Sequence, residues 1–179
     1  TGLETSSVQS FTVNGLPSAP NVDVAPSQPQ TAHNIRGMAA GSVDPEGDEV
    51  QYHFEWYMEG MLWSIDNVLS SEYTQVGQEW EVIATPYDEF GEGKSRSFLF
   101  QIENTGPEHM HVHIEPHGEK YNDSVLSCHG EAEDIDGDPL VYTYEWSIHH
   151  HDILGTEEDL DLAGKVHPDE HITCTVTAT

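Results

Sequence analysis

The sequence predicts an all-β protein made of two tandem β-sandwich domains, the second of which lacks its own last strand. Two observations lead to this prediction. Residues 41–57 return as a recognisable copy at residues 131–147, and alternating apolar and polar residues fill short runs that Gly, Pro, Asn and Asp separate. A repeat of about 90 residues has the size of one β-sandwich domain, and alternation is typical of strands with one buried face.

The repeat matches residues of the same type at a constant spacing of 90 positions. The matched pairs are Pro26 and Pro116, Asp44 and Asp134, Gly47 and Gly137, Asp48 and Asp138, Tyr52 and Tyr142, and Trp56 and Trp146. They combine an acidic turn containing a glycine with the aromatic residues of the strand that follows. Copies of this length indicate two structural units with one fold.

The alternating runs define the expected strands. In one of them Tyr52, Phe54 and Trp56 alternate with polar residues, which predicts one buried and one exposed face. We expect strands at residues 22–25, 50–56, 79–85, 95–102, 112–115, 124–129, 140–146 and 171–177. Arg36 aligns with the apolar Leu126, so the repeat leaves the register of the strand around residue 36 open.

Two cysteines flank Trp146 in the second unit: Cys128 precedes it by 18 residues and Cys174 follows it by 28. This order on three expected strands resembles the immunoglobulin fold, in which two cysteines of facing sheets form a disulfide against a tryptophan. The resemblance implies a Cys128–Cys174 disulfide, which would stabilise the second unit by about 4 kcal/mol; the alternative is two unrelated buried thiols. In the first unit, Met38 and Ala84 take the corresponding places.

The wider resemblance is to bacterial and archaeal Ig-like, PKD-like and cadherin-like repeats. These form tandem arrays in long surface proteins and often carry an Asp-rich loop between two strands, as this chain does at residues 44–48 and 134–138. The resemblance implies two immunoglobulin-like domains in an extracellular or cell-surface protein. A disulfide is likewise typical of proteins outside the reducing cytosol.

The chain divides into a spare last strand with its linker at residues 1–16, a first immunoglobulin-like domain at 17–104, and an incomplete second domain at 105–179. Asn14 and Pro17 align with Asn104 and Pro107, so the first segment repeats the linker before the second domain. Two explanations are open. The chain is an excerpt of a longer array, or residues 5–14 of one subunit complete the second domain of its neighbour and build a fibre.

Each unit carries a tight acidic loop with a glycine. The loop carboxylates are Asp44, Glu46 and Asp48 in the first unit and Asp134, Asp136 and Asp138 in the second. Alternate carboxylates on such a loop can converge on Ca²⁺, which binds about six to eight oxygens, and Asp88 of a loop expected at the same end can add a ligand. We therefore expect Ca²⁺ as a cofactor. The alternative is a turn whose Asp side chains cap its own backbone amides.

Histidine is frequent, with 12 residues, and His109, His111 and His113 alternate along one expected strand. Alternation places the three imidazoles on one face, and imidazole binds Zn²⁺ and Cu²⁺. Successive residues on one face lie about 6.5–7 Å apart, however, which is wide for three ligands of one ion. The alternative is a set of solvent-facing residues that gain charge as the pH falls through about 6.5.

Charge and motifs exclude several functions. The chain has 33 acidic and 5 basic residues and a formal net charge of -28, so it offers no basic surface to nucleic acid, and an anionic membrane would repel it. No run of about 18 apolar residues predicts membrane insertion. The chain has no nucleophile elbow, phosphate-binding glycine loop, His-Glu-x-x-His or Cys-x-x-Cys motif, so we expect no enzyme and no catalytic residue.

These observations predict an extracellular structural or adhesive repeat module, stiffened by calcium and part of a stalk, surface layer or filament. Its expected partners are neighbouring copies of the chain or further repeats of the same chain. The alternative is an accessory module that binds carbohydrate or another ligand through an exposed Trp63, Tyr57 or Tyr73.

Overall fold

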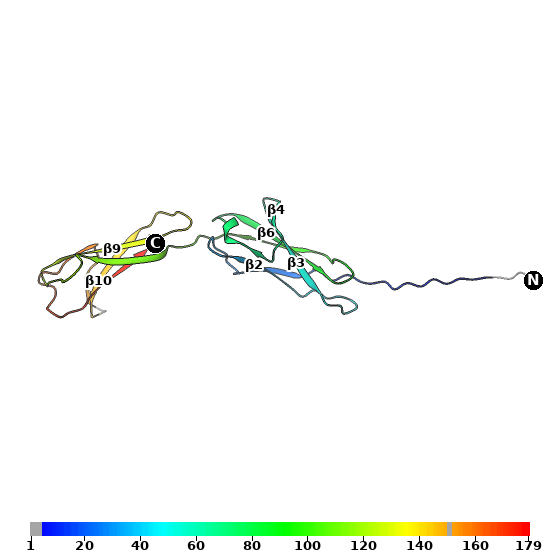
Figure 1. Ribbon diagram of the computed structural model, residues 1–179, viewed down its shortest axis with the longest axis horizontal. Coiled ribbons are helices and arrows are strands. Elements are labelled where there is room, and N and C mark those ends of the chain that lie inside the picture. Colours follow the sequence, from blue (N-terminus) through cyan, green and yellow to red (C-terminus); the bar gives the residue numbers. More distant parts are fainter. Residues whose placement is uncertain (1–4, 150–151) are drawn as a thin grey trace, which may run out of the picture. The chain divides into compact units, whose positions relative to one another are not determined.

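The computed structural model describes residues 5–149 and 152–179, and it is all-β (Figure 1). A single 3₁₀ turn at Ser71–Tyr73 is the one helical element of these residues. The chain forms two compact units, unit 1 at Thr1–Glu103 and unit 2 at Asn104–Thr179. Both units are immunoglobulin-like β-sandwiches, which confirms the predicted fold class.

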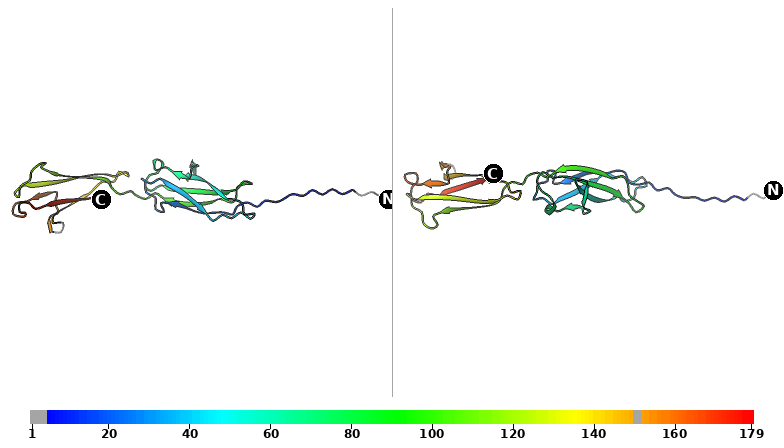
Figure 2. Two further views of the ribbon diagram at one scale, coloured as in Figure 1. Left: turned by 60° about the horizontal axis from the view of Figure 1, so that its bottom comes forward. Right: turned by 90° about the horizontal axis from the view of Figure 1, so that it is seen from above.

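Unit 1 consists of two antiparallel sheets, whose layers are visible from two directions in Figure 2. The first sheet has the order β1-β2-β5, with β1 at Asn21–Ala25, β2 at Ile35–Ala40 and β5 at Val68–Leu69. The second has the order β4-β3-β6-β7, with β3 at Gln51–Met58, β4 at Met61–Ser64, β6 at Glu79–Tyr87 and β7 at Arg96–Gln101.

The core of unit 1 lies between these sheets. Its buried members come from both: Val24, Ile35, Phe54, Trp56, Leu69, Trp80, Val82, Ala84 and Ile102. Along β3 the buried Phe54 and Trp56 alternate with partly exposed residues, as the sequence predicts. Burial of these large side chains is the main stabilising contribution in a sandwich of this size.

Unit 2 repeats this arrangement with fewer strands. One sheet has the order β12-β9-β8, with β8 at Glu108–Glu115, β9 at Val125–Glu133 and β12 at Asp159–Asp161. The other has the order β11-β10-β13, with β10 at Tyr142–Ile148, β11 at Asp152–Gly155 and β13 at Ile172–Ala178. Within residues 104–149 and 152–179, no strand covers the outer edge of β13, whereas β7 covers the equivalent edge of β6.

Trp56 and Trp146 have the same surroundings in their two units. Both are fully buried, and a β-bulge follows each of them. The indole N–H of Trp56 donates to the carbonyl of Asp66 at 2.7 Å, and that of Trp146 donates to the carbonyl of Glu157 at 2.9 Å. The two strands that carry these residues are therefore equivalent, as the repeat predicts.

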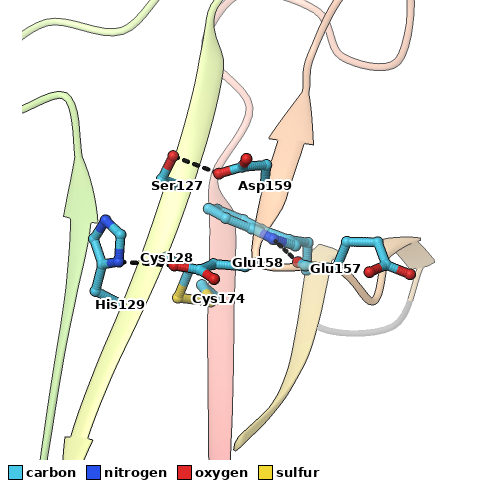
Figure 3. The surroundings of a disulfide bond; sticks show 8 residues. Ser127, Cys128, His129, Glu157, Glu158, Asp159 and Cys174 are labelled. Carbon is cyan, nitrogen blue, oxygen red and sulfur yellow. Dashed lines mark hydrogen bonds and ion pairs between the residues drawn. A yellow bond between two sulfur atoms is a disulfide. The ribbon is translucent and has the colours of Figure 1, made fainter.

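The disulfide between Cys128 and Cys174 is present, with a Cα–Cα distance of 6.5 Å, and it joins β9 to β13 across the sandwich (Figure 3). The predicted places of its counterparts in unit 1 are wrong. Cys128 pairs with Ile114 on β8, and the equivalent partner of Val24 is Gly37.

Differences in loop length account for that error. Cys174 pairs with Trp146, and the residue that pairs with Trp56 is Val82 rather than Ala84. The spacing between equivalent residues is therefore larger than 90 on β9 and β13, because the connections before these strands are longer in unit 2. The same shift aligns Ile35, rather than Arg36, with Leu126.

Residues 5–20, which include the predicted spare strand, form no strand within this single chain; residues 1–4 of the predicted segment 1–16 lie outside the described part. Val8 and Phe11 are 94% and 86% exposed. A strand requires hydrogen bonds to a neighbouring backbone. No described segment of the chain lies beside residues 5–13 as a strand partner, so the apolar residues of this segment remain in solvent.

Candidate metal centre

The acidic loop of unit 1 connects β2 to β3 and is held by Asp44. One oxygen of this side chain, Oδ1, accepts hydrogen bonds from the backbone N–H groups of Glu46, Gly47 and Asp48 at 2.9, 3.0 and 3.1 Å. Gly47 has a φ of 89°, a left-handed conformation that favours glycine. The loop is therefore an Asp-capped turn, which is one of the two structures that the sequence predicts.

Asp88 belongs to the loop between β6 and β7 and has the same arrangement. Its Oδ1 accepts from the N–H groups of Phe90 and Gly91 at 2.7 and 2.8 Å. Because Gln51 of β3 pairs with Tyr87 of β6, the loops that precede β3 and follow β6 lie at the same end of the sheet. This pairing brings Asp88 to Asp44 and Asp48.

Asp44, Asp48 and Asp88 form one group. Each offers a carboxylate oxygen, and the three oxygens lie within 4.8 Å of one another. Asp44 is only 4% exposed, and its second oxygen, Oδ2, is buried without a hydrogen-bond partner, as is Oδ2 of Asp88. In each of these two side chains, one oxygen stabilises the turn while the other has no protein partner.

The charge of this group is uncompensated. The pKa of Asp48 is raised, mainly by partial desolvation and to a smaller extent by repulsion from Asp44, Asp88 and Glu46. The ion pairs in the described part of the chain are all between histidine and a carboxylate. The adjoining pocket adds further acidic side chains, since it is lined by Asp48, Glu49, Gln51, Tyr87, Asp88 and Glu89.

The group has the chemistry of a Ca²⁺ site. Two ligands about 2.4 Å from one ion are at most about 4.8 Å apart, which is the limit that the three carboxylates satisfy. Hard carboxylate oxygens suit Ca²⁺, which also accepts water and carbonyl ligands to complete its shell. Buried carboxylate oxygens without partners are destabilising unless a cation or a proton neutralises them.

Glu46 lies outside this group, in contrast to its predicted role as a ligand. Its Oε2 accepts a hydrogen bond from the backbone N–H of Gly15 at 3.0 Å. In unit 2, Oδ2 of Asp136 accepts from the N–H of Thr105 at 2.7 Å. The middle acidic residue of each loop therefore binds the segment that precedes its own sandwich.

The second acidic loop does not form a matching group. Oδ1 of Asp134 accepts from the N–H groups of Asp136 and Asp138, so the turn has the same conformation as in unit 1. Within the part of the chain that the structure describes, however, Asp134, Asp136 and Asp138 do not bring ligand atoms together. The difference depends on Asp88, which the sequence predicts to lie beside the acidic loop of unit 1.

Comparison with known proteins identifies no family for this chain. No protein-family model matches the chain, and no curated protein matches it. Among solved structures, the chain is similar to the FN1–FN3 domains of chicken CNTN1, with 12% identity and a TM-score of 0.40. The match covers 93% of this chain and 61% of the CNTN1 chain. None of the helical structure in the described residues is long and apolar enough to cross a membrane.

The histidines predicted as a transition-metal site do not share one regular face. A bulge between Glu108 and His111 interrupts the pairing of β8 with β9, and His109 has a φ of 56°. The expected alternation therefore breaks at His109. His111 and His113 remain neighbours, with ring centroids 5.9 Å apart.

The aromatic residues of the alternative ligand site are divided between two places. Trp63 and Tyr73 are 44% and 47% exposed, with ring centroids 6.2 Å apart, and Trp63 packs against the buried Trp80. Tyr57 lines a different pocket, together with Leu99 and Gln101. Partial desolvation and the neighbouring Glu55 raise the pKa of Tyr57.

Proposed function

We propose that this chain is a structural repeat module of a linear array outside the cell, of the kind found in PKD-like or cadherin-like surface proteins. Its role is to hold sandwich domains in series in a stalk, surface layer or filament, with an adhesive surface supported by that array. A Ca²⁺ ion bound by Asp44, Asp48 and Asp88 stiffens unit 1.

The anchoring of the segment before each sandwich carries this proposal. Gly15 binds Glu46 in unit 1, and Thr105 binds Asp136 in unit 2 at the equivalent place. In both units an asparagine precedes this anchored residue. The side-chain amide of Asn14 donates to the carbonyl group of Gly15, and that of Asn104 donates to the carbonyl group of Thr105. Residues 14–15 are therefore the linker of a repeat, just as residues 104–105 are.

Residues 5–13 extend this comparison. Residues 5–13 come just before the linker at residues 14–15, and strand β7 comes just before the equivalent linker at residues 104–105. Residues 5–13 also contain exposed apolar residues, namely Val8, Phe11 and Val13. We infer that they form the last strand of another sandwich, which belongs to a neighbouring copy or to a further repeat of the same chain. The array then continues through each module.

Calcium has a mechanical role in this proposal. The ion neutralises the two buried oxygens of Asp44 and Asp88 and links the loop before β3 to the loop after β6. Cross-linking two loops at one end of a sandwich opposes local unfolding there. The disulfide supports the extracellular location, because such bonds persist in oxidising compartments.

Electron microscopy of the native material tests the proposal. A structural repeat gives linear objects with regularly spaced density along their length, whose flexibility increases when a chelator removes Ca²⁺. Dispersed compact particles that contain this chain, with or without Ca²⁺, would contradict a role in an array.

A second candidate is an accessory module that binds carbohydrate. The half-exposed Trp63 beside Tyr73 supports it, because exposed aromatic rings stack on sugar faces and the pair is already packed against Trp80. Binding to a glycan array that is lost in Trp63→Ala and retained in Tyr57→Ala would support this function. Absence of binding by the wild-type chain would exclude it for the glycans tested.

A further inference from the structure

The outer face of the β8–β9 pair in unit 2 carries a cluster of imidazoles. His113 on β8 lies directly opposite His129 on β9, and their ring centroids are 5.1 Å apart. Two further rings adjoin His113, those of His111 at 5.9 Å and His117 at 6.1 Å. The cluster therefore centres on the cross-strand pair and not on the run of histidines along β8.

Carboxylates orient one ring of this pair. Nδ1 of His129 lies 2.9 Å from Oε1 of Glu158, and its Nε2 lies 4.0 Å from Oε2 of Glu115. Figure 3 shows the His129 ring turned toward Glu158 beside the disulfide. A proton on Nδ1 that is donated to Glu158 leaves the lone pair of Nε2 available to a metal, and metal-binding histidines commonly donate their other N–H to a carboxylate in this way.

We propose that His113, His129 and Glu115 bind a Zn²⁺ ion, with Glu158 as the positioning residue for His129. Two ligands about 2.1 Å from one Zn²⁺ ion are at most about 4.2 Å apart, so the 4.0 Å between Nε2 of His129 and Oε2 of Glu115 already fits one ion. His113 lies opposite His129, but the ligand atoms of the three residues do not all lie within 4.8 Å of one another, so His113 must rotate about its side-chain bonds to bind the same ion.

The donor set selects the metal. Imidazole nitrogen suits Zn²⁺ and other late transition metals, whereas Ca²⁺ takes oxygen ligands. This site therefore has a different chemistry from the three carboxylates of unit 1, and the inference is independent of the proposed array function. A water molecule would complete a tetrahedral shell, because the ligands are accessible: the side chains of His129 and Glu115 are 36% and 53% exposed.

The fold alone does not account for the cluster. In unit 1 the pair equivalent to His113 and His129 is Asp23 and Met38, which face each other across β1 and β2. The two units share the backbone at this place but only unit 2 has imidazoles there. Because unit 1 folds with other residues at this place, we expect substitution at these partly exposed positions to leave the sandwich intact.

The test is a Zn²⁺ titration of the full chain by isothermal calorimetry, with Ca²⁺ in excess to occupy the carboxylates of unit 1. All proteins carry Asn in place of His149, His150 and His151, so that this tract contributes no ligand. We expect one Zn²⁺ per chain. His113→Ala and His129→Ala each weaken binding at least about tenfold, and Glu158→Gln, which affects only the orientation of His129, weakens it about tenfold.

His167→Ala and His171→Ala are matched controls, because both residues are exposed and lie outside the cluster. They leave the affinity unchanged, and unchanged melting temperatures confirm that every variant is folded. Imidazole ¹⁵N spectra provide a second measurement, in which Zn²⁺ shifts the resonances of His113 and His129. The proposal is overturned if the chain takes up no Zn²⁺, or if His129→Ala binds Zn²⁺ as tightly as His167→Ala does.

Discussion

The ring of Phe54 lies against the backbone of Gly37, at the place where unit 2 has Cys128. A Cβ atom on Gly37 would lie 2.6 Å from Cδ1 of Phe54, closer than any ordinary contact. The two units therefore fill the same part of their cores differently. Unit 2 joins its sheets there with a disulfide, and unit 1 places an aromatic ring over a glycine.

Gly37→Ala tests this packing. The added methyl group forces the Phe54 ring or strand β2 to move, and we expect unit 1 to lose about 1–3 kcal/mol of its free energy of unfolding. Denaturant unfolding measures the loss. Gly106→Ala is the control, since nothing lies within 4 Å of that Cβ. Phe54→Leu combined with Gly37→Ala recovers part of the stability; equal stability of Gly37→Ala and wild type would contradict the packing.

Reduction of the disulfide is expected to destabilise unit 2 without affecting the stability of unit 1. The bond spans 46 residues, so on the loop-entropy model its loss lowers the free energy of unfolding of unit 2 by about 4 kcal/mol. Scanning calorimetry with and without a reductant follows the change. Unit 1 contains no cysteine and serves as the internal control, so its transition stays in place. A reductant that shifts both transitions equally would show that the units unfold as one.

If the three carboxylates bind Ca²⁺ as proposed, we expect the ion to stabilise unit 1. At a free Ca²⁺ concentration about 100-fold above the dissociation constant, binding adds about 2.7 kcal/mol to the free energy of unfolding. Asp44→Asn removes this gain, because it takes the charge from the most buried ligand. Asp138→Asn in the equivalent turn of unit 2 is the control and retains the gain. Thermal melts with Ca²⁺ and with a chelator measure it; a gain that persists in Asp44→Asn contradicts the site.

The raised pKa of Asp48 predicts a pH dependence in the absence of Ca²⁺. Because folding raises this pKa, protonated Asp48 favours the folded state, and the contribution is lost as the pH rises through the folded-state pKa. We therefore expect Asp48→Asn to raise the melting temperature of unit 1 near neutral pH. Below the ordinary Asp pKa of about 3.9, the variant and the wild type melt alike.

Thermal melts between pH 3 and pH 7 in a chelator check this expectation, with Asp138→Asn as the control. A variant that melts below the wild type at neutral pH would mean that the Asp48 carboxylate stabilises the loop, contrary to the repulsion described above.

The sequence predicts those strands whose residues are large, alternating and buried. Trp56 and Trp146 identify equivalent strands because one buried face is required on each. The shorter strands β4, β5, β11 and β12 are not predicted, since two to four residues hold too little of an alternating pattern. The register of β2 is missed because loop lengths shift the spacing of the copies, which only backbone pairing reveals.

For the candidate metal centre, the sequence predicts the residue types and the approach of Asp88, but not which carboxylates of the acidic loop meet it. Asp44, Asp48 and Asp88 converge because β3 pairs with β6. Glu46 instead accepts a hydrogen bond from the backbone N–H of Gly15, and a side-chain pattern cannot predict a backbone partner. The imidazole pair of His113 and His129 combines residues from two strands, so inspection of one strand alone finds only half of it.

The hydrogen bonds of Gly15 to Glu46 and of Thr105 to Asp136 are each made within a single unit. Each unit thus contains its own acceptor for the chain segment that enters it. In the array proposed above, this attachment would therefore be duplicated together with each unit.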